Sequence, residues 1–431
     1  MAETISKAEA DALEAADKKY VMRPWTHPKG EPVIIAKGKG CLVWDVHGKE
    51  YLDLTAGYFV NNAGHCHPRI IEAATKQLHE VLQVSGKHGT PATVNLAKKL
   101  IEILPGNMGK VFFSTGGSES NEFALKIARQ YTKKTDVAYL VNGYHGLTLG
   151  ALEVTASQKY RDSAGKPMGT DNYALPIPYP YRSSEVGTEA ETLAKIEKLF
   201  DAHPNTAAII AEPIQAVGGM APSKEWWTKV DQLRRARGIL FIADEVQTGL
   251  GRTGKMFAIE HYGLEPDIIT GGKGLSGGVG SLAMTAATDE VLKPFFGGTT
   301  PTSGGNAVSA AAGLAMIETV IAEGLVENAA KMGRYFTEAC WALKDPWIGD
   351  VRFHGLLGGV ELVSNRDTKA VLGKNEMAKV KDGLHDAGML ITVSGWHGNV
   401  LRLQPALSVT SAELDRFVAA LRKVLVAVRG S

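Results

Sequence analysis

The sequence predicts an α/β fold with a large, mostly parallel sheet and a smaller α+β segment, and three observations lead to this expectation. Short, almost wholly apolar runs recur between residues 111 and 286. Stretches with helical periodicity separate these runs. After about residue 310, long helical stretches with few strands replace the alternation. Apolar strands that alternate with helices are typical of a parallel sheet that is buried on both faces.

The first elements lie before this sheet. Residues 7–19 have the spacing of a helix, and residues 41–54 contain two strand patterns around the turn His47-Gly48. An amphipathic helix is expected over residues 96–103. The strands of the central sheet are then expected at residues 111–114, 137–142, 207–213, 239–245, 267–270 and 281–286.

Helices and a few strands complete the chain. A helix is expected over residues 121–131, directly after the first strand of the central sheet. In the C-terminal part, helices are expected at residues 307–322 and 411–427, with strands near residues 359–363 and 399–403. This last part is therefore expected to form a smaller α+β unit.

The bulk composition excludes several classes of protein. The chain has 431 residues, 44% of them hydrophobic, which is more core than one ordinary domain needs. Its 47 basic and 46 acidic residues leave a net charge of +1, without the basic surplus of a nucleic-acid-binding surface. No run approaches the ~20 apolar residues that span a bilayer, and the charged N-terminus has no apolar signal core. With three scattered cysteines, we expect a cytoplasmic protein with reduced thiols that binds neither nucleic acid nor membrane.

The residues that follow each apolar run matter most, because ligands of an open parallel sheet bind beyond the carboxyl ends of its strands. Gly117 and Ser118 come shortly after the run 111–114, at the start of a helix. Glycines permit close approach of the backbone, and a helix N-terminus offers free N–H groups to an anion. The pattern equally fits an ordinary turn capped by Ser118.

Two further strand ends carry aromatic or acidic residues. Tyr144 and His145 follow the second apolar run, where an aromatic ring could stack on a flat cofactor or pack in the core. Asp244 lies near the end of the fourth run, and burial of a carboxylate is costly unless a partner compensates its charge. A salt bridge to Arg252, a metal and a protonated heterocyclic nitrogen are the alternatives for that partner. No histidines cluster here at ligand spacing, which argues against the metal.

A lysine boxed by glycines follows the run 267–270. Partial desolvation would lower the pKa of the Lys273 amine and prepare it as a nucleophile, although GGKG alone also fits a lysine in a flexible loop. The phosphate-binding pattern GxxxxGK[ST] is absent from the sequence. An anion site, an aromatic ring, a buried carboxylate and a lysine, each after a strand of one sheet, are together the parts that pyridoxal phosphate requires.

The chain resembles the class III (ω-type) aminotransferases, which are pyridoxal-phosphate enzymes of fold type I. The resemblance covers nearly the whole chain, in the motifs WDVHGKEYLDLTAGYFVNNAGHCHP, VFFSTGGSESNEFALKIAR, YHG, AEPIQAVGG, FIADEVQTGLGRTGKMFA, DIITGGKGLSGG, TSGGNAVSAAAGLA and VLRLQPALSVT. It implies a seven-stranded sheet in a large cofactor-binding domain at residues 63–309. An N-terminal segment at residues 1–62 and a C-terminal part at residues 310–431 would together build the small domain.

The resemblance also implies roles for the cofactor-binding residues. Lys273 would hold pyridoxal 5′-phosphate as a Schiff base and move the proton at the substrate carbon, and Asp244 would keep the pyridine nitrogen protonated. Gln247 would bind the ring hydroxyl, while Val246 and Tyr144 would pack against the two ring faces. Gly117 and Ser118 would hold the phosphate, and Thr302 would reach the phosphate of the neighbouring subunit in a homodimer or tetramer. His145 is the remaining residue expected to bind the cofactor.

For the substrate, the resemblance implies a different set of residues. Arg402 matches the arginine that grips a substrate carboxylate, and Glu212 matches the glutamate that can neutralise it when the substrate end is not acidic. An ion pair between these two residues is the structural alternative. Tyr58 and Phe59 stand where many members carry smaller side chains. Together with Trp25, these aromatics suggest a pocket for apolar or compact substrates.

Three functions are compatible with these residues. The leading hypothesis is transfer of an amino group from an ω-amino acid, amine or amino acid to pyruvate, glyoxylate or 2-oxoglutarate, with ping-pong kinetics. The family also contains racemases, a decarboxylating transaminase and lyases that act on aminophosphates or aminophosphonates, and the motifs do not separate these reactions. A binding protein without activity is the third hypothesis, but it would be expected to lack Lys273 or Asp244.

Overall fold

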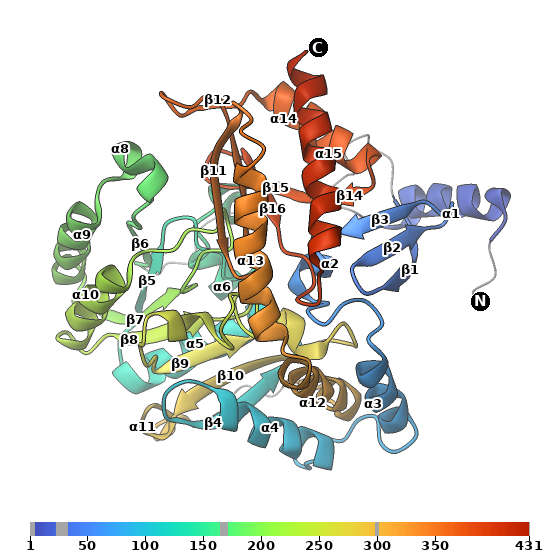
Figure 1. The fold of residues 1–431 in the computed structure, drawn as a ribbon. Coiled ribbons are helices and arrows are strands. Elements are labelled where there is room, and N and C mark those ends of the chain that lie inside the picture. Colours follow the sequence, from blue (N-terminus) through green and yellow to red (C-terminus); the bar gives the residue numbers. More distant parts are fainter. Residues whose placement is uncertain (1–4, 23–32, 164–170, 298–300, 431) are drawn as a thin grey trace.

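The computed structural model describes residues 5–22, 33–163, 171–297 and 301–430. Its largest sheet has seven strands and lies in the lower left part of the view in Figure 1. The strands lie in the order β4 (Met108–Ser114), β10 (Ala283–Thr288), β9 (Ile268–Gly271), β8 (Leu240–Asp244), β7 (Thr206–Ala211), β5 (Asp136–Leu140) and β6 (Tyr173–Leu175). β10 runs antiparallel to both of its neighbours, and the other neighbouring pairs are parallel. The prediction of a mostly parallel sheet of seven strands is therefore confirmed.

Both faces of this sheet are covered, which explains the continuous apolar runs in the sequence. All residues of β7, β8 and β9 are buried. Ile209 packs in the same core as Trp226 of α10 (Lys224–Arg235), whereas its neighbour Ile210 packs in the core that contains Ala124 of α5 (Gly117–Thr132). Because successive side chains of a strand point to opposite faces, each face needs its own apolar set.

Eight more helices of the described residues belong to this part of the fold, and four of them are short. The longer ones are α3 (Pro68–Leu78), α4 (Pro91–Ile103), α9 (Glu189–Ala202) and α12 (Ala307–Ala322), and the short ones are α6 (Leu149–Glu153), α7 (Gln158–Asp162), α8 (Ser183–Val186) and α11 (Asp289–Leu292). Three short 3-10 helices are η1 (Pro180–Arg182), η2 (Ala258–His261) and η3 (Lys273–Ser276).

The two ends of the chain meet in a smaller α+β part. β1 (Ile35–Lys39), β2 (Leu42–Asp45) and β3 (Glu50–Asp53) form a sheet that β14 (Met389–Leu390) extends by pairing parallel with β3. A second sheet has the order β11 (Ile348–His354), β12 (Leu357–Asn365), β16 (Val400–Leu403) and β15 (Thr392–Ser394), with β13 (Ala370–Val371) beside β12. The helices of this part are α1 (Lys7–Tyr20), α13 (Leu325–Trp341), α14 (Lys374–Asp386) and α15 (Ser411–Arg429).

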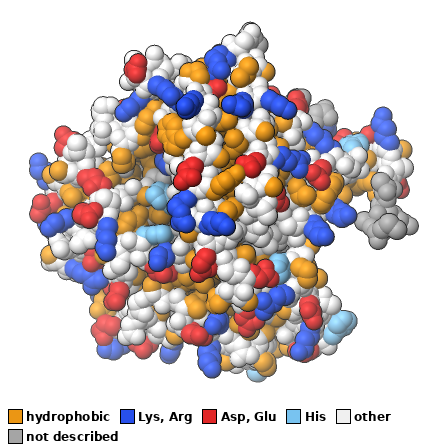
Figure 2. Space-filling model, in the orientation of Figure 1, with side chains coloured by type: hydrophobic (Ala, Val, Ile, Leu, Met, Phe, Trp, Pro, Cys, Tyr) orange, Lys and Arg blue, Asp and Glu red, His pale blue; other side chains and the backbone are white. Residues whose placement is uncertain are grey.

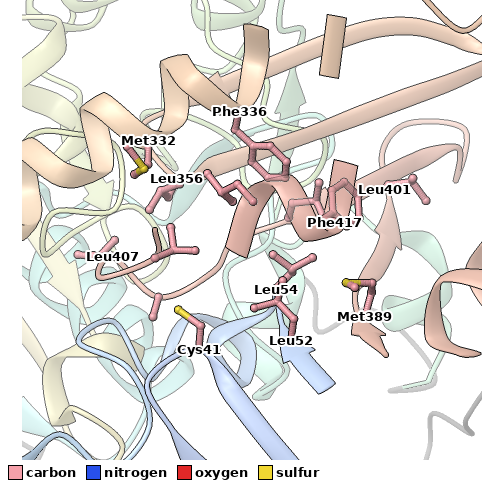
Figure 3. Close-up of a cluster of buried hydrophobic side chains, with 14 of the residues drawn as sticks. Cys41, Leu52, Leu54, Met332, Phe336, Leu356, Met389, Leu401, Leu407 and Phe417 are labelled. Carbon is pink, nitrogen blue, oxygen red and sulfur yellow. The ribbon is translucent and has the colours of Figure 1, made fainter. Parts of the chain in front are cut away.

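One hydrophobic core joins the two chain ends (Figure 3). Cys41, Leu52 and Leu54 come from the N-terminal segment that contains β1, β2 and β3, and they are almost fully buried. In the same core lie Met332, Phe336, Leu356, Met389, Leu401, Leu407 and Phe417, all from the C-terminal part. Burial of this shared apolar surface holds the N-terminal segment to the C-terminal part.

The surface carries both signs of charge. On the face shown in Figure 2, Lys and Arg side chains are interspersed with Asp and Glu side chains. Among the described residues, no single helix has the length and apolar character needed to cross a membrane. The pair α12 and α13, which is bent by 62°, meets the criteria of length and composition only when the two helices are taken together.

Candidate active site

The carboxyl ends of the strands open onto a cavity of about 140 Å³. It is lined by Gly117, Ser118, Asn121, Tyr144, His145, Gly146, Asp244, Val246, Gln247 and Lys273. The fold thus brings together, around one cavity, eight of the nine residues that the sequence predicted to bind the cofactor. The ninth, Thr302, is exposed and is not among the lining residues.

Asp244 is the buried acid of the cavity, with 2% of its surface exposed. Its Oδ2 atom lies 2.7 Å from Nδ1 of His145 and accepts a hydrogen bond of 2.8 Å from Nδ2 of Asn121. Its Oδ1 atom accepts from the backbone amide of Val246 at 3.1 Å. A carboxylate can accept about four hydrogen bonds, so Oδ1 keeps capacity for one more donor, such as a protonated ring nitrogen.

Asn121 is a residue of the cavity that was not predicted from the sequence. Its side-chain oxygen accepts a hydrogen bond from Oγ1 of Thr270 at 2.8 Å, while its amide group donates to Asp244. One feature of the sequence could have indicated it: Asn121 is a polar residue on the buried face of the helix that contains Ser118.

The salt bridge considered for the buried acid is not found. The guanidinium group of Arg252 donates instead to Oδ1 of Asn62 at 2.6 Å and to the carbonyls of Leu356 and Pro405 at 3.1 and 2.5 Å. Within the described ranges, no group of three metal-ligating side chains includes Asp244. Of the three alternatives, the protonated heterocyclic nitrogen is the one that the surroundings of Asp244 favour.

The N-terminus of α5 forms the polar end of the cavity. Gly117 and Ser118 stand in the first turn, where backbone amides have no carbonyl acceptor within the helix. Ser118 does not cap the helix, since Gly116 holds that position, and its Oγ atom accepts from the amide of Leu147 at 3.2 Å. A Cβ atom on Gly117 would lie 2.7 Å from Cγ1 of Val246, so the backbone here passes too close for a larger residue. Free amides, a hydroxyl and a positive helix end suit a phosphate group.

Lys273 lines the same cavity and is the first residue of η3. Its φ is 46°, and its Nζ atom lies 3.5 Å from the carbonyl oxygen of Tyr58. Burial and the nearby charge of Arg402 lower the pKa of Lys273 to about 8, against the opposing effect of Asp244 and Glu212. An amine with this pKa is partly neutral near pH 7 and can act as a nucleophile.

Lys273 also faces a left-handed turn that the sequence did not predict. The four residues of α2 (Ala56–Phe59) all have positive φ, from 46° to 70°. For residues other than glycine this conformation costs roughly 1–2 kcal/mol each. Asp53 stabilises the turn, since Oδ1 accepts from the amide of Thr55 at 2.8 Å and Oδ2 accepts from the amide of Gly57 at 3.1 Å. Strain of this kind concentrates at functional sites, and here it places the ring centres of Tyr58 and Phe59 at 5.8 and 5.5 Å from Nζ of Lys273.

Arg402 and Glu212 do not form the ion pair considered as an alternative. Arg402 is buried, and its guanidinium carbon lies 4.9 Å from the ring centre of Phe59 and 5.6 Å from that of Tyr58. Its Nε atom donates to Gln404, and among the described residues it makes no ion pair with a carboxylate. Arg402 is thus a buried cation whose charge is available to an incoming carboxylate.

Glu212 has partners of its own. Its Oε1 atom accepts from Nε2 of Gln247 at 3.0 Å and from the amide of Ala216 at 3.3 Å, and Oε2 accepts from the amide of Tyr144 at 3.2 Å. Burial raises the pKa of Glu212 to about 7. Near neutral pH this carboxyl group is therefore partly uncharged, which leaves the charge of Arg402 uncompensated.

The residues around the cavity fit pyridoxal phosphate. The α5 N-terminus offers donors for a phosphate, Asp244 offers a buried acceptor for a protonated ring nitrogen, and Lys273 offers an amine. One predicted substrate residue, Trp25, lies outside the described residues, so nothing places it at this site.

Comparison with known proteins agrees with the resemblance that the sequence motifs indicate. The family model for class III aminotransferases matches residues 25–425. The chain is 37% identical over 424 residues to the acetylornithine aminotransferase of Caldanaerobacter subterraneus subsp. tengcongensis, covering 96% of this chain and 99% of that protein. It is 34% identical over 455 residues to the taurine–pyruvate aminotransferase of Bilophila wadsworthia, covering 99% of this chain and 98% of that one.

Solved structures agree with the sequence relatives. An aminotransferase of Bacillus anthracis superimposes with a TM-score of 0.93 at 30% identity, covering 98% of this chain and all of that one. An (S)-enantioselective omega-transaminase of Thermomicrobium roseum superimposes with a TM-score of 0.90 at 31% identity, covering 99% of each chain. The resemblance seen in the sequence is therefore confirmed, and the chain belongs to the class III aminotransferases, pyridoxal-phosphate-dependent enzymes that catalyse transamination.

Proposed function

We propose that this enzyme moves an amino group from an ω-amino acid, amine or amino acid to a small keto acid, with pyruvate, glyoxylate and 2-oxoglutarate as the candidate acceptors. The observation that carries the proposal is Arg402, a buried cation without a carboxylate partner among the described residues, whose charge contributes to the lowered pKa of Lys273. The carboxylate of the keto acid would form an ion pair with Arg402. The names of the relatives, which act on acetylornithine or on taurine and pyruvate, support the same substrate classes.

Pyridoxal phosphate, when bound, supplies an aldehyde that reacts with amines and a ring that withdraws electrons from the reacting carbon. In our proposal, Nζ of Lys273 holds the cofactor and then moves the proton at the substrate carbon. Asp244 keeps the ring nitrogen protonated, and His145 and Asn121 fix the orientation of its carboxylate.

The other proposed contacts position the cofactor. Val246 and Tyr144 hold the ring between them. Gly117 and Ser118 bind the phosphate at the positive end of α5. Gln247 donates one of its two amide hydrogens to Glu212, so its second amide hydrogen and its oxygen remain for the ring hydroxyl.

Glu212 and Arg402 would let one site accept two kinds of substrate end. When a keto acid binds, Arg402 takes its carboxylate, and Glu212 stays protonated or bound to Gln247. When an amine without a carboxylate binds, Glu212 ionises and offsets the charge of Arg402. The pKa of Glu212, raised to about 7 by burial, makes either protonation state accessible near neutral pH.

The dependence on a keto acid tests the proposed reaction directly. Purified enzyme given an amine should convert at most one equivalent per active site, because the amino group stays on the cofactor until an acceptor removes it. Addition of pyruvate should restore continuous turnover, measured as alanine formed per amine consumed. Full turnover of the amine without any keto acid would instead identify a lyase, racemase or decarboxylase.

We also propose that the enzyme acts in the cytoplasm as a homodimer, or as a tetramer built from such dimers, in which Thr302 binds the phosphate in the partner's site. Thr302 is exposed, and its carbonyl accepts from Gln83 at 2.6 Å. Large apolar side chains are exposed on and after α3, namely Ile71, Leu78 and Leu82. An exposed apolar surface of this kind beside Thr302's partner Gln83 suits contact with a second copy.

Light scattering should therefore give at least twice the mass of one chain. Thr302→Ala should weaken cofactor binding about tenfold or more, the effect of losing one hydrogen bond to a charged group. Equilibrium dialysis measures this affinity, with Thr302→Ser and Ser303→Ala as variants that should bind normally. A fully active monomer, or unchanged affinity in Thr302→Ala, would contradict the proposal.

A further inference from the structure

A buried carboxylate outside the active site gathers charged partners from two parts of the fold. Glu361 of β12 is completely buried. Its Oε1 atom accepts from Nε of Arg182 at 2.7 Å and from Nδ2 of Asn399 at 3.4 Å. Its Oε2 atom lies 2.8 Å from Arg352 and accepts a hydrogen bond from the hydroxyl of Tyr179. Burial alone would raise the pKa of Glu361, but these partners hold it below its usual value.

The partners of Glu361 come from both sides of a contact between the large sheet and the small part. Tyr179 and Arg182 belong to the segment that follows β6, at the edge of the large sheet. Arg352 and Asn399 belong to the sheet of the small part, on β11 and just before β16. Glu361 therefore ties the small sheet to the segment after β6 through Arg182 and Tyr179, while Arg352 is its ion-pair partner within the small sheet.

Arg352 extends this connection to the segment that begins at Glu212. Its Nε atom donates to the carbonyl of Gly218 at 2.5 Å. Gly218 and Gly219 form a turn with φ of 89° and 65°, and a Cβ atom on Gly219 would lie 3.0 Å from the Cα atom of Gly358 in β12. The backbone of the segment after Glu212 thus rests directly on the small sheet, beside Arg352.

Arg402 lies on the same sheet as Glu361. In the pairing of β12 with β16, Gly359 is opposite Arg402 and Glu361 is opposite Val400. Residues directly opposite in an antiparallel pair share a face, and residues two apart on a strand share a face as well. The side chains of Glu361 and Arg402 therefore project from one face of the small sheet.

We infer that Glu361 is a positioning residue for recognition of the substrate carboxylate. Its ion pairs with Arg182 and Arg352 fix the small sheet against the segment that starts at Glu212, and so set the position of Arg402 relative to Glu212. This inference rests on the proposed role of Arg402 in binding the keto acid. Loss of the Glu361 charge leaves each arginine a second carboxylate, Glu185 or Asp350, so the variant is expected to fold with a looser contact.

Half-reactions of the holoenzyme test the inference. Glu361→Gln keeps the shape of the side chain and removes its charge. The pyruvate concentration that gives half the limiting rate should rise about tenfold, and the limiting rate should stay within about twofold. With 1-phenylethylamine, an amine without a carboxylate, both constants should stay within about twofold. Calorimetry with propionate, which has a carboxylate but no keto group, should show the same weakening without turnover.

Two further variants separate positioning from loss of stability. Tyr179→Phe removes one hydrogen bond to Glu361 and leaves all charges in place. The pyruvate concentration that gives half the limiting rate should therefore rise about threefold. It carries the test if Glu361→Gln fails to fold. Asp345→Asn removes another buried carboxylate of the small part, which pairs with Arg429 at 2.7 Å. This variant should leave the constants for both pyruvate and the amine unchanged.

The outcomes distinguish this inference from the proposed function. Equal changes for pyruvate and for the amine, or the same change in Asp345→Asn, would mean a merely structural role and would overturn the inference. If Arg402→Gln leaves the pyruvate constant unchanged, the proposed role of Arg402 fails. If Arg402→Gln raises that constant but Glu361→Gln and Tyr179→Phe do not, the inference about Glu361 alone fails.

Discussion

Replacement of Lys273 by alanine should reduce transamination by a factor of about 10⁴ or more, because proton transfer by a positioned side chain alone contributes about 10²–10⁴. Lys273 lines the same cavity as Asp244 and Ser118. With its pKa lowered to about 8, about a tenth of the amine is neutral at pH 7, against about one part in 3,000 for a lysine at 10.5. The native lysine already has a φ of 46°, so alanine adds no new backbone strain.

Two measurements check this expectation besides turnover. Borohydride should link the cofactor covalently to the peptide that carries Lys273 in the wild type, and to no peptide in the variant. The apo-protein should take up cofactor faster as pH rises to about 8 and level off above it, since a lowered pKa releases the proton earlier. Lys255→Ala, at an exposed lysine, is the matched control and should behave as the wild type. Cofactor linkage elsewhere, or activity retained in Lys273→Ala, would refute the assignment.

The strands of the large sheet could be predicted because the physics that forms them is local. β7, β8 and β9 are buried on both faces, so most of their residues are apolar and each run stands out in the sequence. β6, with only three residues at the edge of the sheet, gives no such pattern and was not predicted. The same holds for the antiparallel direction of β10, since strand direction depends on tertiary connections rather than composition.

In the candidate site, too, local sequence patterns predict some residues and miss others. Gly117, Asp244 and Lys273 each lie at or just after the end of a strand, so the rule that ligands bind at the carboxyl ends of strands was enough to predict that they lie together. The partners of Glu361 lie 9 to 182 residues away from it, and no local pattern joins them. The left-handed turn at Tyr58 was not predicted either, because hydrogen bonds from the amides of Thr55 and Gly57 to the carboxylate of Asp53 override the usual preference of non-glycine residues.

Asp244→Asn should reduce the rate of the chemical step by about 10³, the loss typical of removing one preorganised electrostatic contact, while the cofactor still binds. Two donors, Nδ2 of Asn121 and Nδ1 of His145, fix the Oδ2 side of the carboxylate. The amide of an asparagine must therefore turn its oxygen toward them and its NH₂ group toward the Oδ1 side. There it would meet the amide of Val246 and the cofactor nitrogen, donor against donor, and would favour the unprotonated ring.

Asn121→Ala separates the effect of the charge on Asp244 from the effect of its orientation. That variant keeps the charge of Asp244 and its contact with His145 and removes only one of the two donors, so about a tenfold loss is expected. Single-turnover rates, normalised to the cofactor content from absorbance, measure both effects. A hundredfold gap between the variants means that the charge on Asp244 matters more than its orientation. Similar losses in both would mean that the network merely shapes the cavity, and the role assigned to the carboxylate as partner of the ring nitrogen would have to be abandoned.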